Sequence, residues 1–125
     1  MSSPERSWAC KFREAFRGVK TGARGQSSFF VHFFFAAAVV ATAAVLCMGY
    51  IDWCLLLLCI TVVLTAEMFN SAMESVAKAI TDEDNPHVGD FLDIGAAAVL
   101  LASIGAAVIG SLIFLHRIAE LLGWC

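Results

Sequence analysis

The chain has 125 residues, 60% of them hydrophobic, and a formal net charge of −3. So apolar a composition excludes an ordinary soluble domain, and the length fits a single domain. We therefore expect one membrane domain over residues 1–125, with no nucleic-acid partner.

Residues 1–28 are amphipathic and basic. Aromatic side chains recur there at helical spacing at Trp8, Phe12 and Phe16. Six of the eight Lys and Arg residues lie between or beside them: Arg6, Lys11, Arg13, Arg17, Lys20 and Arg24. This pattern predicts a helix on the membrane surface, with its basic edge toward anionic headgroups. A flank that only orients the protein is the alternative. The positive-inside rule places this end in the cytoplasm, and no cleavable signal sequence precedes the first apolar run.

Three apolar runs follow, and they predict transmembrane helices over residues 29–49, 53–80 and 92–118, since about 20 residues cross a bilayer. The expected fold is an all-α membrane protein with a surface helix and three spans. With the N-terminus inside, residues 49–52 lie outside and a loop over residues 81–91 lies inside. Asn85-Pro86 predicts a turn within that loop.

The third run carries small residues at four-residue spacing, namely Ala98, Ala102, Ala106 and Gly110. Small side chains at this interval let helix backbones approach closely in lipid. The stripe predicts a packed bundle and an oligomer, because three helices of one chain offer few buried faces.

Residues 65–78, "TAEMFNSAMESVAK", place polar side chains where the second run leaves the membrane. These side chains recur at i, i+3, i+4, i+7 and i+11, which is one face of a helix: Glu67, Asn70, Ser71, Glu74 and Lys78. Residues 53–66 cover about 21 Å of a hydrocarbon core about 30 Å thick. Glu67 is therefore expected inside the cytoplasmic leaflet, where an ionisable residue is a functional-site hypothesis.

Two carboxylates on this face suit different tasks. The deeper Glu67 suits proton abstraction from a lipid hydroxyl at the same depth. Glu74, about 10 Å further along, suits Mg²⁺ that carries nucleotide phosphates. Phosphoryl transfer needs these parts. The alternative is that Glu67 pairs with a basic residue or a neighbouring chain and only holds the bundle together.

The segments "AEMFNSAMESVAKAI" and "LDIGAAAVLLA" closely resemble the signature of the prokaryotic diacylglycerol kinase family, which includes the undecaprenol kinases. "FREAFRGVKTG" and "SSFFVH" extend the resemblance over almost the whole chain. The resemblance implies a homotrimeric inner-membrane kinase with active sites shared between subunits. It also implies MgATP as the phosphate donor and a lipid hydroxyl, of diacylglycerol or undecaprenol, as the acceptor.

The resemblance assigns roles to single residues. Glu67 matches the catalytic base and Glu74 a metal-binding glutamate. Asn70 and Ser71 match the polar pair between them, and both are expected to bind the nucleotide. Glu67 and Asn70 are also expected to bind the lipid substrate. Asp93 matches the aspartate of a nucleotide-side Lys-Asp pair, and Gly95 the glycine that opens the third helix.

The chain also departs from the family pattern. Gln26 aligns with a second metal-binding glutamate, Leu92 replaces the lysine of the Lys-Asp pair, and Lys78 stands where aspartate is usual. Lys78 is a candidate replacement for the lost cation. His32 resembles a histidine of the undecaprenol-kinase branch, but in its aromatic run we expect it to pack or to lie at the interface.

These departures leave a second function open, a non-catalytic trimeric scaffold or pseudokinase. An ion pathway through Glu67 and Glu74 is a third, but the first and third runs carry no intramembrane acid to continue it.

Overall fold

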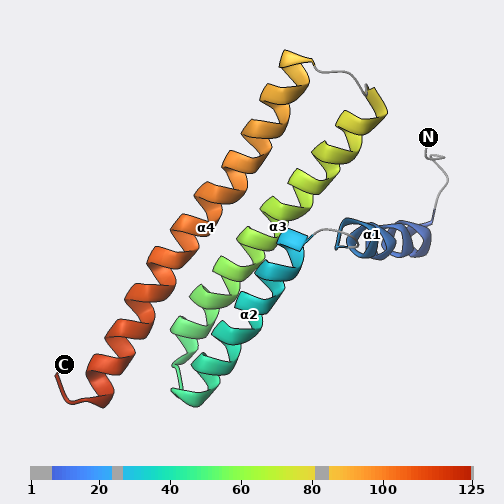
Figure 1. The fold of residues 1–125 in the computed structure, drawn as a ribbon. Coiled ribbons are helices and arrows are strands. Elements are labelled where there is room, and N and C mark those ends of the chain that lie inside the picture. The colour runs from blue at the N-terminus through green and yellow to red at the C-terminus, as the bar shows by residue number, and fades with distance from the viewer. Residues whose placement is uncertain (1–6, 24–26, 81–84, 125) are drawn as a thin grey trace.

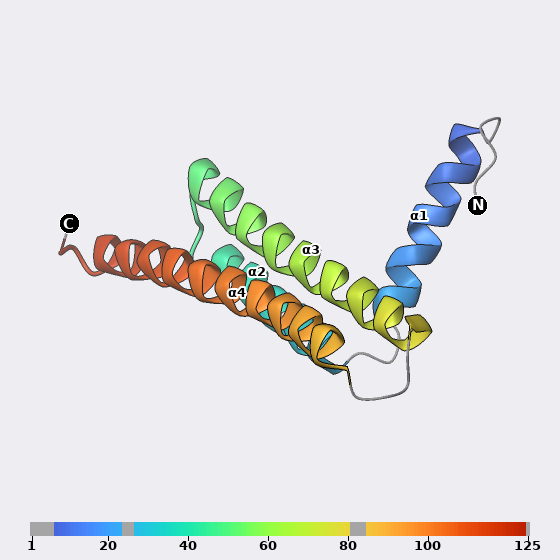
Figure 2. The ribbon, with the colours of Figure 1, turned by 90° about the horizontal axis from the view of Figure 1, so that it is seen from above.

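The computed structural model describes residues 7–23, 27–80 and 85–124, and these fold into four helices. They are α1 (Trp8–Ala23), α2 (Ser27–Val45), α3 (Tyr50–Ile80) and α4 (Pro86–Leu121). Helices α2, α3 and α4 run side by side, whereas α1 points away from them (Figure 1). The view from above shows the same arrangement (Figure 2). Over the described residues the all-α prediction is confirmed.

Helix α1 has the amphipathic character that the sequence predicts. Its first turn is capped by Ser7, whose Oγ accepts a hydrogen bond from the backbone N–H of Cys10 at 3.3 Å. Trp8 and Phe16 are exposed, and the Lys11 ammonium lies 4.5 Å from the centre of the Trp8 ring. Exposed rings beside cations suit a helix that lies in a headgroup layer.

The connection between α2 and α3 lies earlier in the chain than predicted, over residues 46–49. Helix α2 ends at Val45, because Cys47 takes a left-handed backbone conformation (φ 53°). The N–H groups of Cys47 and Met48 donate back to the carbonyls of Ala44 and Ala43, both at 3.2 Å, which closes the end of the helix. Helix α3 then begins at Tyr50 rather than at residue 53.

The predicted turn at Asn85-Pro86 is wrong, because these residues start α4. The Asn85 side chain accepts a hydrogen bond from the N–H of His87 at 2.9 Å, which caps the helix. Pro86 occupies the first turn, where its missing N–H costs nothing. Residues 86–91, expected in a loop, are therefore helical.

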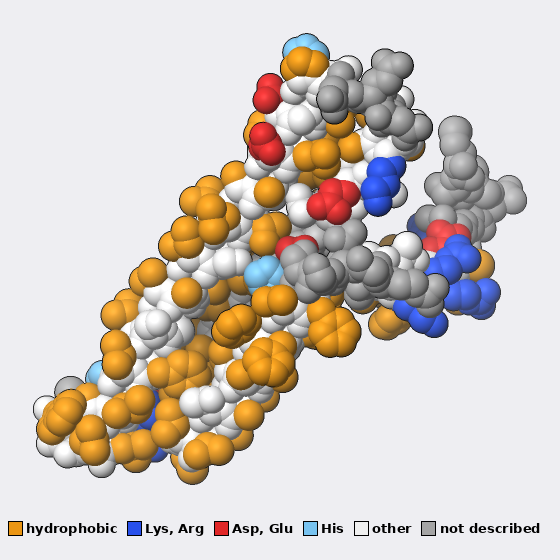
Figure 3. Space-filling model, viewed as in Figure 1, with side chains coloured by type: hydrophobic (Ala, Val, Ile, Leu, Met, Phe, Trp, Pro, Cys, Tyr) orange, Lys and Arg blue, Asp and Glu red, His pale blue; other side chains and the backbone are white. Residues whose placement is uncertain are grey.

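Helices α3 and α4 are each long and apolar enough to cross a membrane, by length and composition. The apolar part of α2, Phe29–Val45, is shorter. Hydrophobic side chains cover most of the visible face of the three-helix part, and charged side chains gather toward the end that carries α1 (Figure 3). The third span stays a prediction.

Helix α3 is the centre of the molecule and packs against each of the other three helices. At the end opposite α1 the core consists of Ala43, Met48, Leu56 and Ile113. There the guanidinium Nε of Arg117 donates to the Leu46 carbonyl at 2.8 Å, which joins α4 to the end of α2.

Three of the four residues of the small-residue stripe on α4 lie beside the other helices of the same chain. Ala98 lines a groove with residues of α3, and Ala106 and Gly110 line a cavity with residues of α2 and α3. Open space lies beside them, since a Cβ added at Gly110 would meet no atom within 4 Å, so the close approach that the stripe predicts stays a prediction. The oligomer remains a prediction.

Candidate functional site

Glu67 is buried in the middle of the bundle. It lies on α3 with only 2% of its surface exposed. His32 of α2 contacts it, with Nε2 3.5 Å from the Glu67 Oε2. A carboxylate this deep in an apolar helix bundle is costly to maintain, which marks it as a functional candidate.

Asn70, one turn further along α3, connects Glu74 to α4. Its amide Nδ2 donates to the Glu74 Oε1 at 3.2 Å. Its Oδ1 is buried and has no hydrogen-bond partner among the described residues. That oxygen faces Gly95 of α4, where an added Cβ would lie 2.6 Å from it. The glycine therefore allows α4 to lie directly against Asn70.

Ser71, Glu74 and Lys78 open instead toward α1. They line a groove of about 530 Å³ between α1 and α3, together with Gly18 and Gly22 of α1. The Ser71 Oγ is buried and unpartnered within the described part of the chain.

The predicted single polar face is therefore divided among three neighbouring helices: Glu67 meets α2, Asn70 meets α4, and Ser71, Glu74 and Lys78 face α1. Residues on one face of a helix still differ in direction by up to about a third of a turn. Neighbouring residues of the polar face can therefore contact different helices.

The remaining predicted residues lie less centrally. Asp93 is exposed on α4 and Leu92 is half-buried beside it. Gln26 lies outside the described residues. Within residues 7–23, 27–80 and 85–124, no three His, Cys, Asp or Glu side chains come together as a metal cluster.

Glu74 nevertheless fits one role that Mg²⁺ requires. This ion usually keeps several waters and takes one or two protein carboxylates together with substrate phosphates. Glu74 supplies a half-buried carboxylate beside a groove that also carries the Lys78 ammonium. The donor set therefore suits a cation that arrives bound to phosphates.

His32 is a candidate site residue to which the sequence analysis assigned no role. It was expected to pack or to lie at the interface, yet it contacts the buried acid. The signal was available, because His32 is the only ionisable side chain in the sequence of α2. The rule that marked Glu67, that ionisable residues within membrane helices are functional candidates, applies to it equally.

Comparison with known proteins gives the class of this chain. The family model for prokaryotic diacylglycerol kinase matches residues 13–114. The undecaprenol kinase of Bacillus subtilis is 31% identical over 107 residues, which cover 86% of this chain and 87% of that protein. The diacylglycerol kinase of a Synechocystis species is 31% identical over 112 residues, which cover 89% of this chain and 64% of that longer protein.

By class, therefore, the chain is a lipid kinase. It belongs to the prokaryotic diacylglycerol kinase family, which confirms the resemblance seen in the sequence.

Proposed function

We propose that this chain transfers the γ-phosphate of ATP to the hydroxyl of a membrane lipid at the cytoplasmic face of a prokaryotic inner membrane. The observation that carries the proposal is the burial of Glu67 beside His32 in an otherwise apolar bundle. Membership of a lipid kinase family supports it.

In the proposed reaction Glu67 is the general base. Its carboxylate takes the proton of the lipid hydroxyl as the hydroxyl oxygen attacks the γ-phosphorus. The bond from that phosphorus to the bridging oxygen breaks, and ADP leaves with the bond's electrons. His32 positions the Glu67 carboxylate, and Asn70 orients the acceptor. Such proton transfer contributes about 10²–10⁴-fold to a rate.

The nucleotide is assigned to the groove between α1 and α3. Glu74 would hold Mg²⁺, with Gln26 as a second, neutral ligand, and this ion supplies charge neutralisation at the phosphates. Ser71 would donate a hydrogen bond to the nucleotide, and the Lys78 ammonium lines the same groove. Asn70 lies toward α4 and would act on the nucleotide through its hydrogen bond to Glu74. Asp93, near the start of α4, would also take part in nucleotide binding, as the resemblance implies.

The proposed assembly is a homotrimer with shared active sites, three spans for each chain (residues 29–49, 53–80 and 92–118) and a cytoplasmic N-terminus. Large apolar side chains are exposed on all three bundle helices, as at Phe34, Leu58 and Leu101. Lipid tails and neighbouring chains are the surroundings that such side chains suit. The basic α1 supports the orientation.

The second candidate function is a trimeric scaffold without catalysis. Gln26 and Leu92 favour it, because each replaces a charged ligand of the family pattern. The buried Glu67–His32 contact favours catalysis, because a bundle needs no buried acid to pack.

Phosphate transfer tests the proposal. Purified protein in mixed micelles would receive radiolabelled ATP, Mg²⁺, and either diacylglycerol or undecaprenol. We expect label in the lipid fraction with at least one acceptor, and the comparison of the two identifies it. An intact oligomer that labels neither lipid would establish the scaffold.

A further inference from the structure

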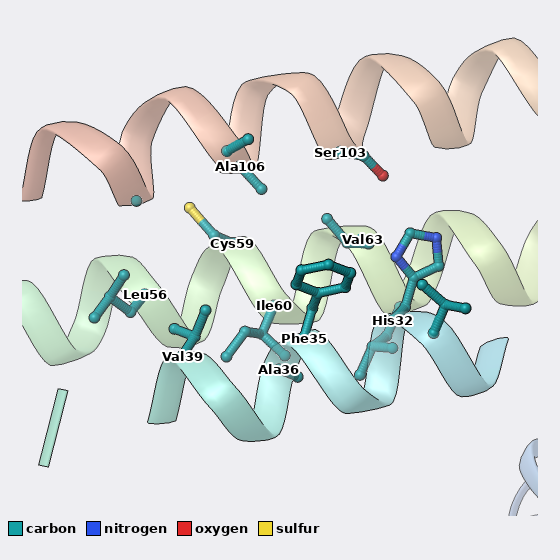
Figure 4. A pocket seen from close by; sticks show the side chains of 14 residues that line it. His32, Phe35, Ala36, Val39, Leu56, Cys59, Ile60, Val63, Ser103 and Ala106 are labelled. Atoms are coloured by element: carbon teal, nitrogen blue, oxygen red, sulfur yellow. The ribbon is translucent and has the colours of Figure 1, made fainter. Parts of the chain in front are cut away.

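Helices α2, α3 and α4 line a cavity of about 350 Å³ that is open on one side (Figure 4). Phe35 of α2, Ile60 of α3 and Ala106 of α4 are among its lining residues, so each helix supplies one wall. The cavity lies within the bundle and is separate from the groove between α1 and α3.

The two ends of this cavity differ in polarity. His32 and Ser103 lie together at one end, and Leu56 and Val39 lie at the other (Figure 4). The Ser103 Oγ is buried without a hydrogen-bond partner among the described residues. His32 contacts Glu67. The polar end is therefore the end next to the proposed catalytic base, and the remaining wall is almost entirely apolar.

The dimensions suit a hydrocarbon chain. The α3 wall extends from Leu56 to Leu64, which is about 12 Å at 1.5 Å per residue. A long apolar space with one polar end matches a lipid whose hydroxyl lies at His32 and Glu67 and whose tail continues toward Leu56. A tail in contact with these walls also gains dispersion contacts with three helices.

We infer that this cavity binds the hydrocarbon tail of the acceptor lipid and so delivers its hydroxyl to Glu67. The inference rests on the proposed function for the identity of the acceptor. It adds a binding site for the lipid tail within a single chain. The width of the cavity at Ala106 and Gly110 would then determine which tails fit.

Gly110 allows a direct test, because it lines the cavity and a Cβ added there meets no atom within 4 Å. A larger side chain at this position would enter the cavity without displacing the helices. Gly105, on the same helix, is exposed, also has nothing within 4 Å and does not line the cavity. Gly110→Leu and Gly105→Leu are therefore a matched pair.

Photolabelling reads the tail site without requiring turnover. The probe is a diacylglycerol with a diazirine in its acyl chain, added to the full-length protein in mixed micelles, with peptides mapped by mass spectrometry. We expect label on cavity residues of the wild type and Gly105→Leu, competed by unlabelled diacylglycerol. Gly110→Leu should lose about tenfold or more, because losing two buried methylenes weakens binding by about that factor.

Phosphate transfer on the same preparations separates this inference from the proposed function. Gly110→Leu should raise KM for a long-chain acceptor while turnover of a diacylglycerol with four-carbon tails stays at the wild-type level.

Label in the cavity without phosphate transfer by the wild type would retain the tail site and reject the kinase mechanism. Label confined to outer helix faces, as expected if a neighbouring chain fills the cavity, would overturn the inference. Equal cavity label in Gly110→Leu and Gly105→Leu would overturn it too. Should Gly110→Leu change the oligomer size, Ala106→Val provides the same test with a smaller addition.

Discussion

At the scale of single residues, the candidate site is centred on two ionisable side chains that meet between α2 and α3. The Glu67 carboxylate and the His32 imidazole lie 3.5 Å apart, and each comes from a different helix. A carboxylate that contacts a residue on another helix is held in one orientation more firmly than a carboxylate without such a contact. Orientation matters because a base must lie within hydrogen-bond reach of the proton it removes.

The first prediction concerns His32. His32→Leu should lower the turnover of lipid phosphorylation by about tenfold or more, because a buried polar group that loses a partner is destabilised by about 1–3 kcal/mol. His32→Gln keeps an amide N–H that can reach Glu67 and should retain most of the activity. Initial rates at saturating ATP measure both. Equal loss in the two variants would show that the imidazole acts only through its volume.

The second prediction concerns the proposed metal ligands, Glu74 and Gln26. Glu74→Gln should raise the Mg²⁺ concentration for half-maximal activity, since removal of a negative ligand weakens the hold on a dication. Gln26→Glu should lower it, because it adds a carboxylate where the family pattern has one. Titration of Mg²⁺ at fixed lipid compares the three proteins. An unchanged midpoint in both variants would place the cation elsewhere.

At the scale of the helix, packing decides which residue meets which neighbour. The 3.6-residue period predicted that Glu67, Asn70 and Glu74 share a face, and the depth of Glu67 followed from counting residues. That α2 covers Glu67 while α4 covers Asn70 did not follow, because local periodicity carries no information on long-range packing. The start of α4 was missed for a different reason. Asn-Pro serves both turns and helix N-termini, and the choice depends on whether the Asn85 side chain caps the next residues.

The third prediction concerns the approach of α4 to α3. Gly95→Ala should destabilise the protein by about 1–3 kcal/mol, because the added Cβ overpacks against Asn70 and Met73. It should also lower activity, since Asn70 must shift and its bond to Glu74 is lost. Gly105→Ala is the matched control, with open space around the new Cβ. Thermal unfolding in detergent micelles measures stability. Equal midpoints for the two variants would mean that the contact at Gly95 is unimportant.

At the scale of the whole molecule, the basic α1 and the apolar bundle predict how the chain lies in the membrane. The all-helical fold follows from composition and periodicity alone. The number of spans depends on how α2, with its shorter apolar part, meets the bilayer, and assembly depends on surfaces that only a second chain can cover. Neither is encoded in the local pattern of one chain.

The fourth prediction tests this topology with cysteines. Cys10 lies on α1, and Cys47 is exposed in the turn between α2 and α3. In cells that carry single-cysteine variants, a membrane-impermeant thiol reagent should label Cys47 from outside. It should reach Cys10 only after the membrane is permeabilised. Labelling of both cysteines from the same side would mean that α2 does not cross.

The central claim is that Glu67 is the base in phosphate transfer to lipid, and a rate measurement tests it most directly. The measurement is the initial rate of label transfer from ATP to the acceptor by the wild type, Glu67→Gln and Glu120→Gln, all in mixed micelles. Glu120 is a half-exposed carboxylate at the far end of α4, beside Arg117, so its amide variant controls for loss of charge. We expect Glu67→Gln to keep the wild-type oligomer size and to lose about 10²-fold or more in rate, with Glu120→Gln unchanged. A Glu67→Gln rate within a few-fold of the wild type would contradict the assignment.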